Sequence, residues 1–351
     1  MTISDITSRG KAWQASSRRE DIELKRASEI CLADIQWLWP GWIALKKLHV
    51  LAGDGGTGKT TLSLAMASII SKGGAWPDGS LAPVGNVIVW SGEDDATDTI
   101  APRLRAAGAD MDRVFIVGDV RGENGYRPFD PSVDLPVLAR EAERVGAVAL
   151  LIVDPIVSVV SGDGHKNVDV RRSLQPLVDL GMQLGCAVVG ISHFSKGATA
   201  SDPLQRVTGS IAFGAVARVV LVAGKKSGSD VRVLARAKSN IGPDTDGFAY
   251  RIALSDAPFS ASYVTWGEPL TGSARELLAD MQGTDTFESA GRAAASWLQD
   301  FLREGPQPVA AIQAASERAG VSWRTLERAK SAAGVRSEKD TSGGGWRWVL
   351  P

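Results

Sequence analysis

The sequence predicts an α/β fold, in which a mainly parallel twisted sheet is flanked by helices and followed by a small, mostly helical domain. Between residues 31 and 266, short apolar runs alternate with stretches of helical periodicity. Strands that are buried on both faces of a parallel sheet have this continuous apolar character. A glycine-rich loop also joins the first strong apolar run, 48–52, directly to a helical stretch, and this order of elements is typical of phosphate-binding α/β proteins.

The composition is that of a globular protein without a strong charge. Of the 351 residues, 44% are hydrophobic and 23% are charged, with 39 lysines and arginines against 40 aspartates and glutamates. Because the net charge is near zero, any contact with nucleic acid must come from local basic groups. The N-terminus lacks the apolar run of a signal peptide, and no run approaches the ~20 residues of a membrane span. We therefore expect a cytoplasmic protein.

The expected elements follow the chain in a regular order after an N-terminal arm, residues 1–30. We predict strands at 48–52, 87–91, 114–117, 149–153, 187–192, 219–223 and 231–238. Helices are predicted between the early strands, at 60–72, 97–107, 133–145 and 168–184. The last two strands and the extended stretches 247–254 and 262–266 have no helical pattern between them. This indicates an antiparallel extension that completes a domain spanning residues 31–266.

A second domain is predicted at the C-terminus, over residues 289–351. A linker that contains a short helix is expected before it, at 267–288. Three short helical patterns follow, at 289–303, 308–319 and 323–332, and a final segment carries a glycine triplet before Trp346. Three helices and a hairpin are typical of a winged helix-turn-helix, so we expect a winged-helix-like domain.

The loop GDGGTGKT (53–60) carries the strongest functional signal. Glycines let the backbone curl so that its N–H groups point at phosphate oxygens, and the N-terminus of the next helix adds the positive end of its dipole. Lys59 would contact the β- and γ-phosphates of ATP, and the Thr60 hydroxyl would bind Mg²⁺. The residues expected to hold the nucleotide are Gly53, Asp54, Gly55, Gly56, Thr57, Gly58, Lys59, Thr60 and Thr61.

A buried strand that ends in an acid supplies the second part of the expected site. The run 149–153 is followed by Asp154. In an α/β sheet, ligands collect at the carboxyl ends of neighbouring strands. Asp154 is therefore expected to complete the Mg²⁺ site beside Thr60.

Glu93 is expected to orient the attacking water. Asp154 is followed by Pro155 and not by a second acid, so the base must come from another strand. Glu93 follows the strand 87–91 in the run Glu93-Asp94-Asp95, where its carboxylate could face the γ-phosphate. The three acids could instead begin a solvated helix. We expect Glu93 in the site and the two aspartates as helix caps.

Several segments, in this order, resemble the RecA-like P-loop ATPases of the RepA type, which are ring-forming helicases of plasmids and phages related to DnaB and RadA. The resemblance covers roughly residues 32–255, and the P-loop within it is generic. Its segments are WPGW, LAGDGGTGKTT, VIVWSGEDD, LLIVDP, VVGISHFSK, VTGSIAFGAVARVVLV and ARAKSNIGP. The aromatic residues of the first segment could flank the nucleotide base, but packing against the sheet is the favoured interpretation.

The resemblance implies roles for residues at matching positions. Glu93 would be the general base, and His193, at the end of the strand 187–192, would sense the γ-phosphate unless it is an ordinary loop residue. Lys238 and Arg236 would reach the nucleotide of a neighbouring subunit. The relatives carry a Lys-x-Arg pair, whereas here Lys238 is followed by Asn240. The arginine finger therefore stays open between Arg236 and Arg218.

The resemblance also implies DNA contacts in the central channel of a ring. Two long loops, 158–172 and 196–210, would make these contacts. Ordinary surface charge is the alternative for these loops. The helix predicted at 323–332 could contact duplex DNA, or the domain could instead dock proteins or orient the subunits. The candidate nucleic-acid residues are Lys166, Arg171, Arg172, Lys196, Arg206, Arg324, Arg328 and Lys330.

The function expected from these features is that of an ATP- and Mg²⁺-dependent DNA motor. It would form a homo-oligomeric ring, a hexamer, with single-stranded DNA in its channel, and act as a replicative helicase of a plasmid, phage or mobile element. Two alternatives stay open. One is a recombination-mediator or clock-type ATPase that does not unwind DNA, and the other is a DNA-binding regulator whose assembly ATP controls.

Overall fold

The computed structural model describes residues 23–123, 125–163, 166–195, 203–207, 211–226, 228–256, 260–282, 286–303, 305–321, 323–339 and 346–350. The chain divides into two units, Met1–Ile35 and Gln36–Pro351. In the described part of the first unit, a single turn of helix, η3 (Ala27–Glu29), buries no side chain. Leu24 and Leu32 there are exposed.

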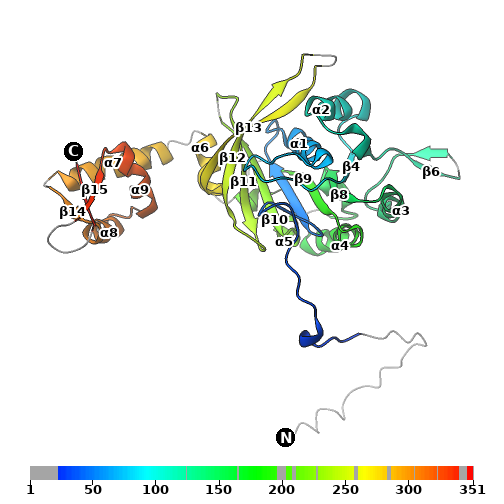
Figure 1. Ribbon diagram of the computed structural model, residues 1–351, viewed down its shortest axis with the longest axis horizontal. Helices are drawn as coiled ribbons and strands as arrows, with labels where there is room; N and C mark the ends of the chain where they lie inside the picture. Colours follow the sequence, from blue (N-terminus) through cyan, green and yellow to red (C-terminus); the bar gives the residue numbers. More distant parts are fainter. Residues whose placement is uncertain are drawn as a thin grey trace, which may run out of the picture. The chain divides into compact units, whose positions relative to one another are not determined.

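The second unit contains a large mixed sheet with the strand order β13-β12-β11-β10-β3-β9-β8-β4-β5 (Figure 1). The strands from β10 to β5 run parallel, and β11, β12 and β13 add to them in antiparallel fashion. The predicted α/β fold with its antiparallel extension is thereby confirmed. The strands are β3 (Leu48–Gly53), β4 (Asn86–Ser91), β5 (Val114–Ile116), β8 (Val148–Asp154), β9 (Ala187–His193), β10 (Val219–Lys225), β11 (Arg232–Ser239), β12 (Thr245–Leu254) and β13 (Ser262–Ser273).

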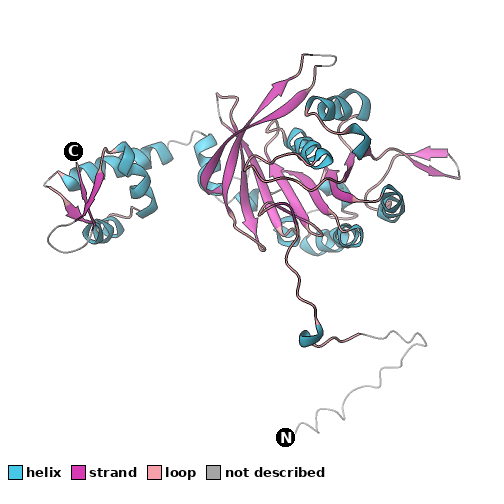
Figure 2. Cartoon of the chain, viewed as in Figure 1, coloured by secondary structure: helices cyan, strands magenta, loops and turns pink. Residues whose placement is uncertain are grey.

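Helices cover both faces of this sheet (Figure 2). They are α1 (Lys59–Lys72), α2 (Ala101–Ala106), α3 (Leu135–Val145), α4 (Asn167–Leu184), α5 (Ile211–Val216) and α6 (Ala274–Gln282). The predicted helix at 97–107 is divided into a π-helical turn, η4 (Ala96–Ile100), and α2. The smaller elements are β1 (Trp37–Trp39), β2 (Ile43–Ala44), β6 (Val120–Gly122), β7 (Gly125–Arg127), η5 (Met111–Arg113), η6 (Ile156–Val159) and η7 (Pro203–Arg206).

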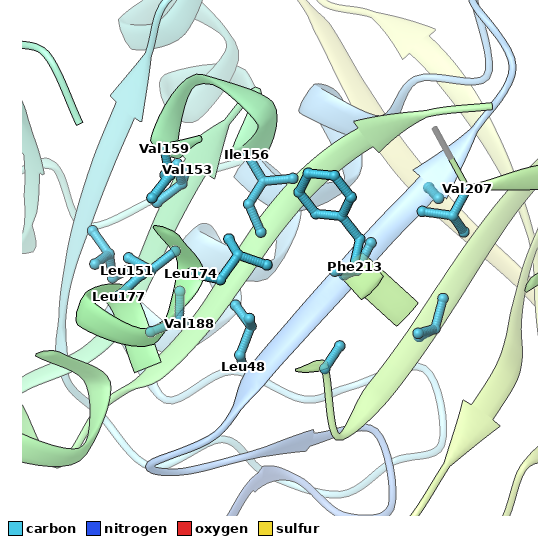
Figure 3. Packing of buried hydrophobic residues seen from close by; sticks show 14 of the residues in the cluster. Leu48, Leu151, Val153, Ile156, Val159, Leu174, Leu177, Val188, Val207 and Phe213 are labelled. Carbon is cyan, nitrogen blue, oxygen red and sulfur yellow. The ribbon is translucent and has the colours of Figure 1, made fainter. Parts of the chain in front are cut away.

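Alternation along the strands gives each face of the sheet its own apolar core. Leu151 and Val153 of β8 pack with α4 on one face, and Leu150 and Ile152 pack with α1 on the other, because successive side chains of a strand point to opposite sides. Figure 3 shows the first core, where Phe213 of α5 also lies. Strands that are apolar on both faces fix the sheet between its helices and leave its carboxyl edge for polar groups.

The C-terminal end of the sheet differs from the predicted linker at 267–288. Strand β13 continues to Ser273, and α6 then packs Leu277 and Leu278, each 4% exposed, into the core. Gly267 and Pro269 make this stretch look like a loop, but β13 is the edge strand of the sheet, where both residue types are tolerated. Residues 267–282 therefore belong to the sheet and its covering helix.

Three tryptophans of this unit, Trp39, Trp42 and Trp76, pack against one another. Trp39 is fully buried and stacks on Trp42 and on Trp76, with ring centroids 4.7 and 4.6 Å apart. The indole N–H of Trp76 donates to the Leu38 carbonyl, and that of Trp39 donates to Asp78. The favoured interpretation of this segment as core packing therefore agrees with the structure.

The C-terminal residues form the expected helices and hairpin around a small core. The elements are α7 (Thr286–Leu302), β14 (Gln307–Pro308), α8 (Val309–Arg318), α9 (Trp323–Ala332), β15 (Arg336–Lys339) and β16 (Trp346–Val349). Strand β16 lies between β14, which was not expected, and β15. Leu298, Ile312, Leu326 and Trp348 are buried together.

None of the helices in the described ranges is long and apolar enough to cross a membrane.

Candidate functional site

The glycine loop lies between β3 and α1, as the sequence predicts. Gly56 and Gly58 have φ values of 75° and 87°, a left-handed conformation that favours glycine. A side chain at Gly58 would meet Ile252, and one at Gly53 would meet the carbonyl of Ala223. The loop therefore needs glycine both for its curl and for its close approach to β10 and β12.

Two hydroxyl groups hold the shape of this loop. Thr57 Oγ1 donates to the Asp54 carbonyl at 2.9 Å, and Tyr250 Oη donates to the Thr57 carbonyl at 2.7 Å. Burial raises the pKa of the Tyr250 phenol, so it remains a protonated donor at neutral pH. Tyr250 belongs to β12, far along the chain, and no sequence pattern marks it as part of the site.

Lys59 lies inside the loop with only 5% of its surface exposed. Its Nζ donates to the carbonyls of Gly53 and Asp54 at 3.1 and 3.0 Å. Burial lowers the pKa of this ammonium, and nearby carboxylates, first that of Asp154, oppose the shift. The lysine ammonium therefore lies within the loop, at a position from which it could contact phosphate oxygens.

Thr60 and Asp154 meet across the sheet edge. Thr60 Oγ1 donates to Asp154 Oδ2 at 2.7 Å, and Asp154 is 2% exposed. Burial raises the pKa of this carboxyl, the Thr60 hydrogen bond opposes the shift, and the charges of Glu93 and Asp94 add to it. The strands of the two residues are not neighbours as expected, because β9 lies between β3 and β8.

The donor set of this pair fits Mg²⁺. A hydroxyl and a carboxylate oxygen are hard ligands, and Mg²⁺ is commonly bound through one or two protein oxygens together with substrate phosphates and water. Within the described ranges there is no cluster of three or more His, Cys, Asp or Glu side chains that could hold a metal ion. A cation here would also favour the ionised form of Asp154.

Glu93 and His193 open onto the same cavity. Glu93 follows β4 and His193 ends β9, and their Oε1 and Nε2 atoms are 3.8 Å apart. The cavity has a volume of about 240 Å³ and is also lined by Lys59, Thr60 and Asp154. The sheet edge therefore brings together the residues predicted for phosphate, metal and water.

The two other acids of the run at 93–95 have different places. Asp95 caps η4, because its side chain accepts hydrogen bonds from the backbone N–H groups of Thr97 and Asp98. Asp94 does not cap a helix as expected; it forms an ion pair with Arg103 at 2.9 Å. Arg103 and Asp94 both line the cavity. The sequence around Arg103 shows only an ordinary helical pattern. The nearby acids Asp94 and Asp95 are the one local signal that could have identified it as a site residue.

Arg236 and Lys238 each donate hydrogen bonds to carbonyls of their own chain. Arg236 is 6% exposed, donates to the carbonyls of Thr245 and Gly41, and lies 4.3 Å from the centre of the Trp42 ring. Lys238 Nζ donates to carbonyls at the end of α5, those of Gly214 and Ala217. These contacts lie within one chain, and the predicted contact of both side chains with the nucleotide of a neighbouring subunit stays a prediction.

The candidate nucleic-acid residues fall into three groups. Arg171 and Arg172 are exposed near the start of α4, and Lys166 precedes this helix, 3.9 Å from Asp163. The first long loop is thus shorter than predicted, because η6 and α4 occupy most of it. Arg206 binds the P-loop residue Asp54, and Lys196 lies outside the described residues.

The residues of the C-terminal helix α9 are only partly described. The side chains of Arg324 and Arg328 lie outside the described residues. Lys330 does not point freely outward as expected, because its Nζ donates to Ser337 at 2.5 Å and lies 4.7 Å from the centre of the Trp348 ring. Leu326 and Ala329 face the core as predicted.

A buried lysine in a glycine loop, next to a threonine–aspartate pair at the carboxyl edge of a parallel sheet, belongs to the P-loop nucleoside triphosphatases. Comparison with known families agrees. Residues 16–199, just over half of the chain, match the family described as AAA domain, and the chain is a member of that family. It is therefore a nucleotide-binding P-loop protein of the ATP-hydrolysing class. A comparison with curated proteins gives no significant match.

Proposed function

We propose that the chain hydrolyses ATP in the cavity at the carboxyl edge of the sheet and uses this reaction to drive a ring-forming motor along single-stranded DNA. The observation that carries the hydrolysis part is the Glu93 carboxylate, which opens onto the same cavity as Lys59 and the Thr60–Asp154 pair. In this arrangement the Glu93 carboxylate could orient the attacking water in the cavity that the phosphate loop also lines.

Each of these residues has a defined part in the proposed reaction. Lys59 exchanges the carbonyls of Gly53 and Asp54 for β- and γ-phosphate oxygens, and the loop N–H groups hold the remaining oxygens. Thr60 and Asp154 would hold Mg²⁺, which neutralises charge on the phosphates when it is bound. Glu93 accepts the proton of the attacking water.

His193 is proposed as the residue that reports the state of the γ-phosphate. It ends β9, the strand between β3, which leads into the phosphate loop, and β8, which ends in Asp154, and its Nε2 is 3.8 Å from Glu93 Oε1. A group that contacts both the water-orienting acid and the phosphate would change its position when the phosphate leaves. Its half-exposed side chain, 47% accessible, leaves room for this movement.

The DNA part of the proposal has support from the resemblance to ring helicases and from the position of basic residues. Arg171 and Arg172 are exposed in the first turns of α4, and α4 follows β8, whose last residue is Asp154. Basic groups near the edge that carries the site could track a phosphate backbone with little base reading. The setting would be the replication of a plasmid, phage or mobile element, with the protein as a hexamer.

A DNA-binding regulator is the second candidate, because of the C-terminal elements. Helices α8 and α9 pack with β16 around Leu326 and Trp348, which is compatible with a winged helix that binds duplex DNA. In this case ATP would control assembly and would not drive movement.

The ATPase rate with single-stranded, duplex and forked DNA, each over a range of salt, separates these functions. A motor should be stimulated most by single-stranded or forked DNA, and replacing Arg171 and Arg172 together by alanine should reduce that stimulation. The matched control is Arg144→Ala on α3, an exposed arginine paired with Glu141. If the protein is a regulator, its Lys59→Ala variant should still bind duplex DNA. ATP turnover without any response to DNA would favour the recombination-mediator or clock-type ATPase.

A further inference from the structure

Arg206 lies against the phosphate loop of its own chain. Its Nη2 is 3.0 Å from Asp54 Oδ2, and its guanidinium is 4.3 Å from the centre of the Phe194 ring. Only 13% of the Arg206 side chain is exposed. An arginine with a carboxylate partner and an aromatic ring beneath it is not a free group for tracking DNA.

A short stretch of backbone holds Arg206 in this place. Val207, directly after η7, forms an antiparallel bridge with Phe194. The backbone N–H of Ser195 donates to the Arg206 carbonyl at 2.8 Å. The N–H of Phe194 in turn donates to the carbonyl of Gly53 at 3.2 Å. Residues 203–207 are thus tied to the end of β9, and this end is tied to the first residue of the phosphate loop.

The partner of Arg206 is an acid in a loop whose ligand is itself negatively charged. The Asp54 carbonyl accepts a hydrogen bond from Lys59, and the Asp54 carboxylate is one of the charges that act on the lysine. Without a counter-charge this carboxylate would repel a triphosphate and compete for the lysine. Arg206 Nε also has no hydrogen-bond partner among the residues that the structure describes, so the guanidinium retains a donor.

We propose that Arg206 is a positioning residue of the nucleotide site, which neutralises Asp54 and fixes its carboxylate so that the loop accepts a nucleoside triphosphate. The pair also connects residues 203–207 to the phosphate loop within one subunit. The inference rests on nucleotide binding at this loop and adds a residue that DNA contact alone would not require.

Calorimetric titration of the full chain with Mg-ATP, without nucleic acid, tests this role. Arg206→Gln should weaken binding about tenfold, because a charge-assisted pair is lost and a carboxylate is left unpaired. The double variant Asp54→Asn/Arg206→Gln should return to within about twofold of Asp54→Asn, since no charge then needs a partner. The matched control is Arg144→Gln, which breaks the exposed pair with Glu141 on α3 and should bind as the unchanged chain does.

The possible outcomes are distinct. Unchanged affinity in Arg206→Gln would overturn the inference, as would a double variant that is as weak as the single one. If Arg206→Gln does not fold, Arg206→Lys, which keeps the charge, should show a loss smaller than tenfold; a larger loss contradicts charge neutralisation. Failure of the unchanged chain to bind Mg-ATP would instead overturn the nucleotide site, whatever Arg206 does.

Discussion

Thr60 and Asp154 are 94 positions apart in the chain, and their side chains are joined by a 2.7 Å hydrogen bond. The bond links the start of α1 to the end of β8 across the intervening strand β9. The metal pair therefore forms only in the folded sheet. Asp154 is the first of four residues for which we predict the effect of a substitution.

Asp154→Asn should stabilise the protein without ligand while removing its response to magnesium. The pKa of Asp154 is raised in the folded state, so stability is lost as the pH rises from the ordinary aspartate range through this pKa, and at neutral pH the buried carboxylate is destabilising. Asparagine can still accept the Thr60 hydrogen bond. We expect thermal unfolding to shift upward by about 2–4 °C, and the added stability from Mg-ATP to be lost. A lower melting temperature without ligand would contradict this account of the buried charge.

Lys59→Ala should abolish nucleotide binding. The ammonium is the buried cation of the phosphate loop, and alanine offers no charge to the β- and γ-phosphates. Calorimetric titration with Mg-ATP should give no heat. Lys72→Ala, an exposed lysine at the other end of α1, is the control and should bind normally. Binding by the Lys59 variant would mean that the nucleotide lies elsewhere.

Glu93→Gln should bind ATP normally and turn it over at least about 100-fold more slowly. The amide keeps the size of the side chain but cannot accept the proton of the attacking water, and general-base contributions are of this size. Measurements of binding and of phosphate release in parallel separate the two effects. Glu141→Gln on α3 changes the same group at an exposed ion pair and should leave turnover unchanged. Equal rates for the two variants would assign the base to another residue.

His49 should make the stability of the protein depend on pH. It is fully buried in β3, its Nε2 accepts from the Ala44 N–H, and its Nδ1 bonds to the Val188 carbonyl. Burial lowers its pKa from 6.5 to about 4. Since the unfolded chain takes up the proton first, stability is lost as the pH falls from about 6.5 towards 4.

Denaturant unfolding at pH 7.5 and pH 5 checks this effect. His49 should contribute a loss of about 2 kcal/mol between the two values. His49→Gln cannot take up this proton, so its loss of stability over the same range should be smaller by about this amount. Parallel pH dependence in both proteins would show that another group is responsible.

The parts of the fold that the sequence predicts are those that depend on local patterns. The run at 48–52 followed by a glycine loop identifies β3 and α1, and the acids after the runs at 87–91 and 149–153 come to one edge because parallel strands end together. The order of the strands is a long-range property, and the position of β9 between β3 and β8 has no local signal. Likewise, Gly267 and Pro269 make the second half of the edge strand β13 resemble a loop in the sequence. Its pairing with β12 depends on the whole sheet.

Two of the candidate residues whose surroundings differ from prediction, Arg206 and Arg236, are arginines. A basic residue in a loop or at a strand end has the same local pattern whether it is exposed or buried. Arg236 is enclosed by Trp42 and two carbonyls, and Arg206 by Phe194 and Asp54. These surroundings come from segments far apart in the chain. Only the folded structure separates such structural arginines from those available to a ligand.

The hydrogen bonds of Lys59 to the loop carbonyls affect which anions the loop should prefer. Because two of the three N–H donors of its ammonium already bond to carbonyl oxygens of the loop, an anion that displaces these carbonyls gains only the difference between its own attraction and these bonds. A single inorganic phosphate or sulfate offers little surplus, whereas a polyphosphate that also engages the amides and a cation offers several attachments at once. The loop should therefore prefer a polyphosphate with a bound cation to a single small anion.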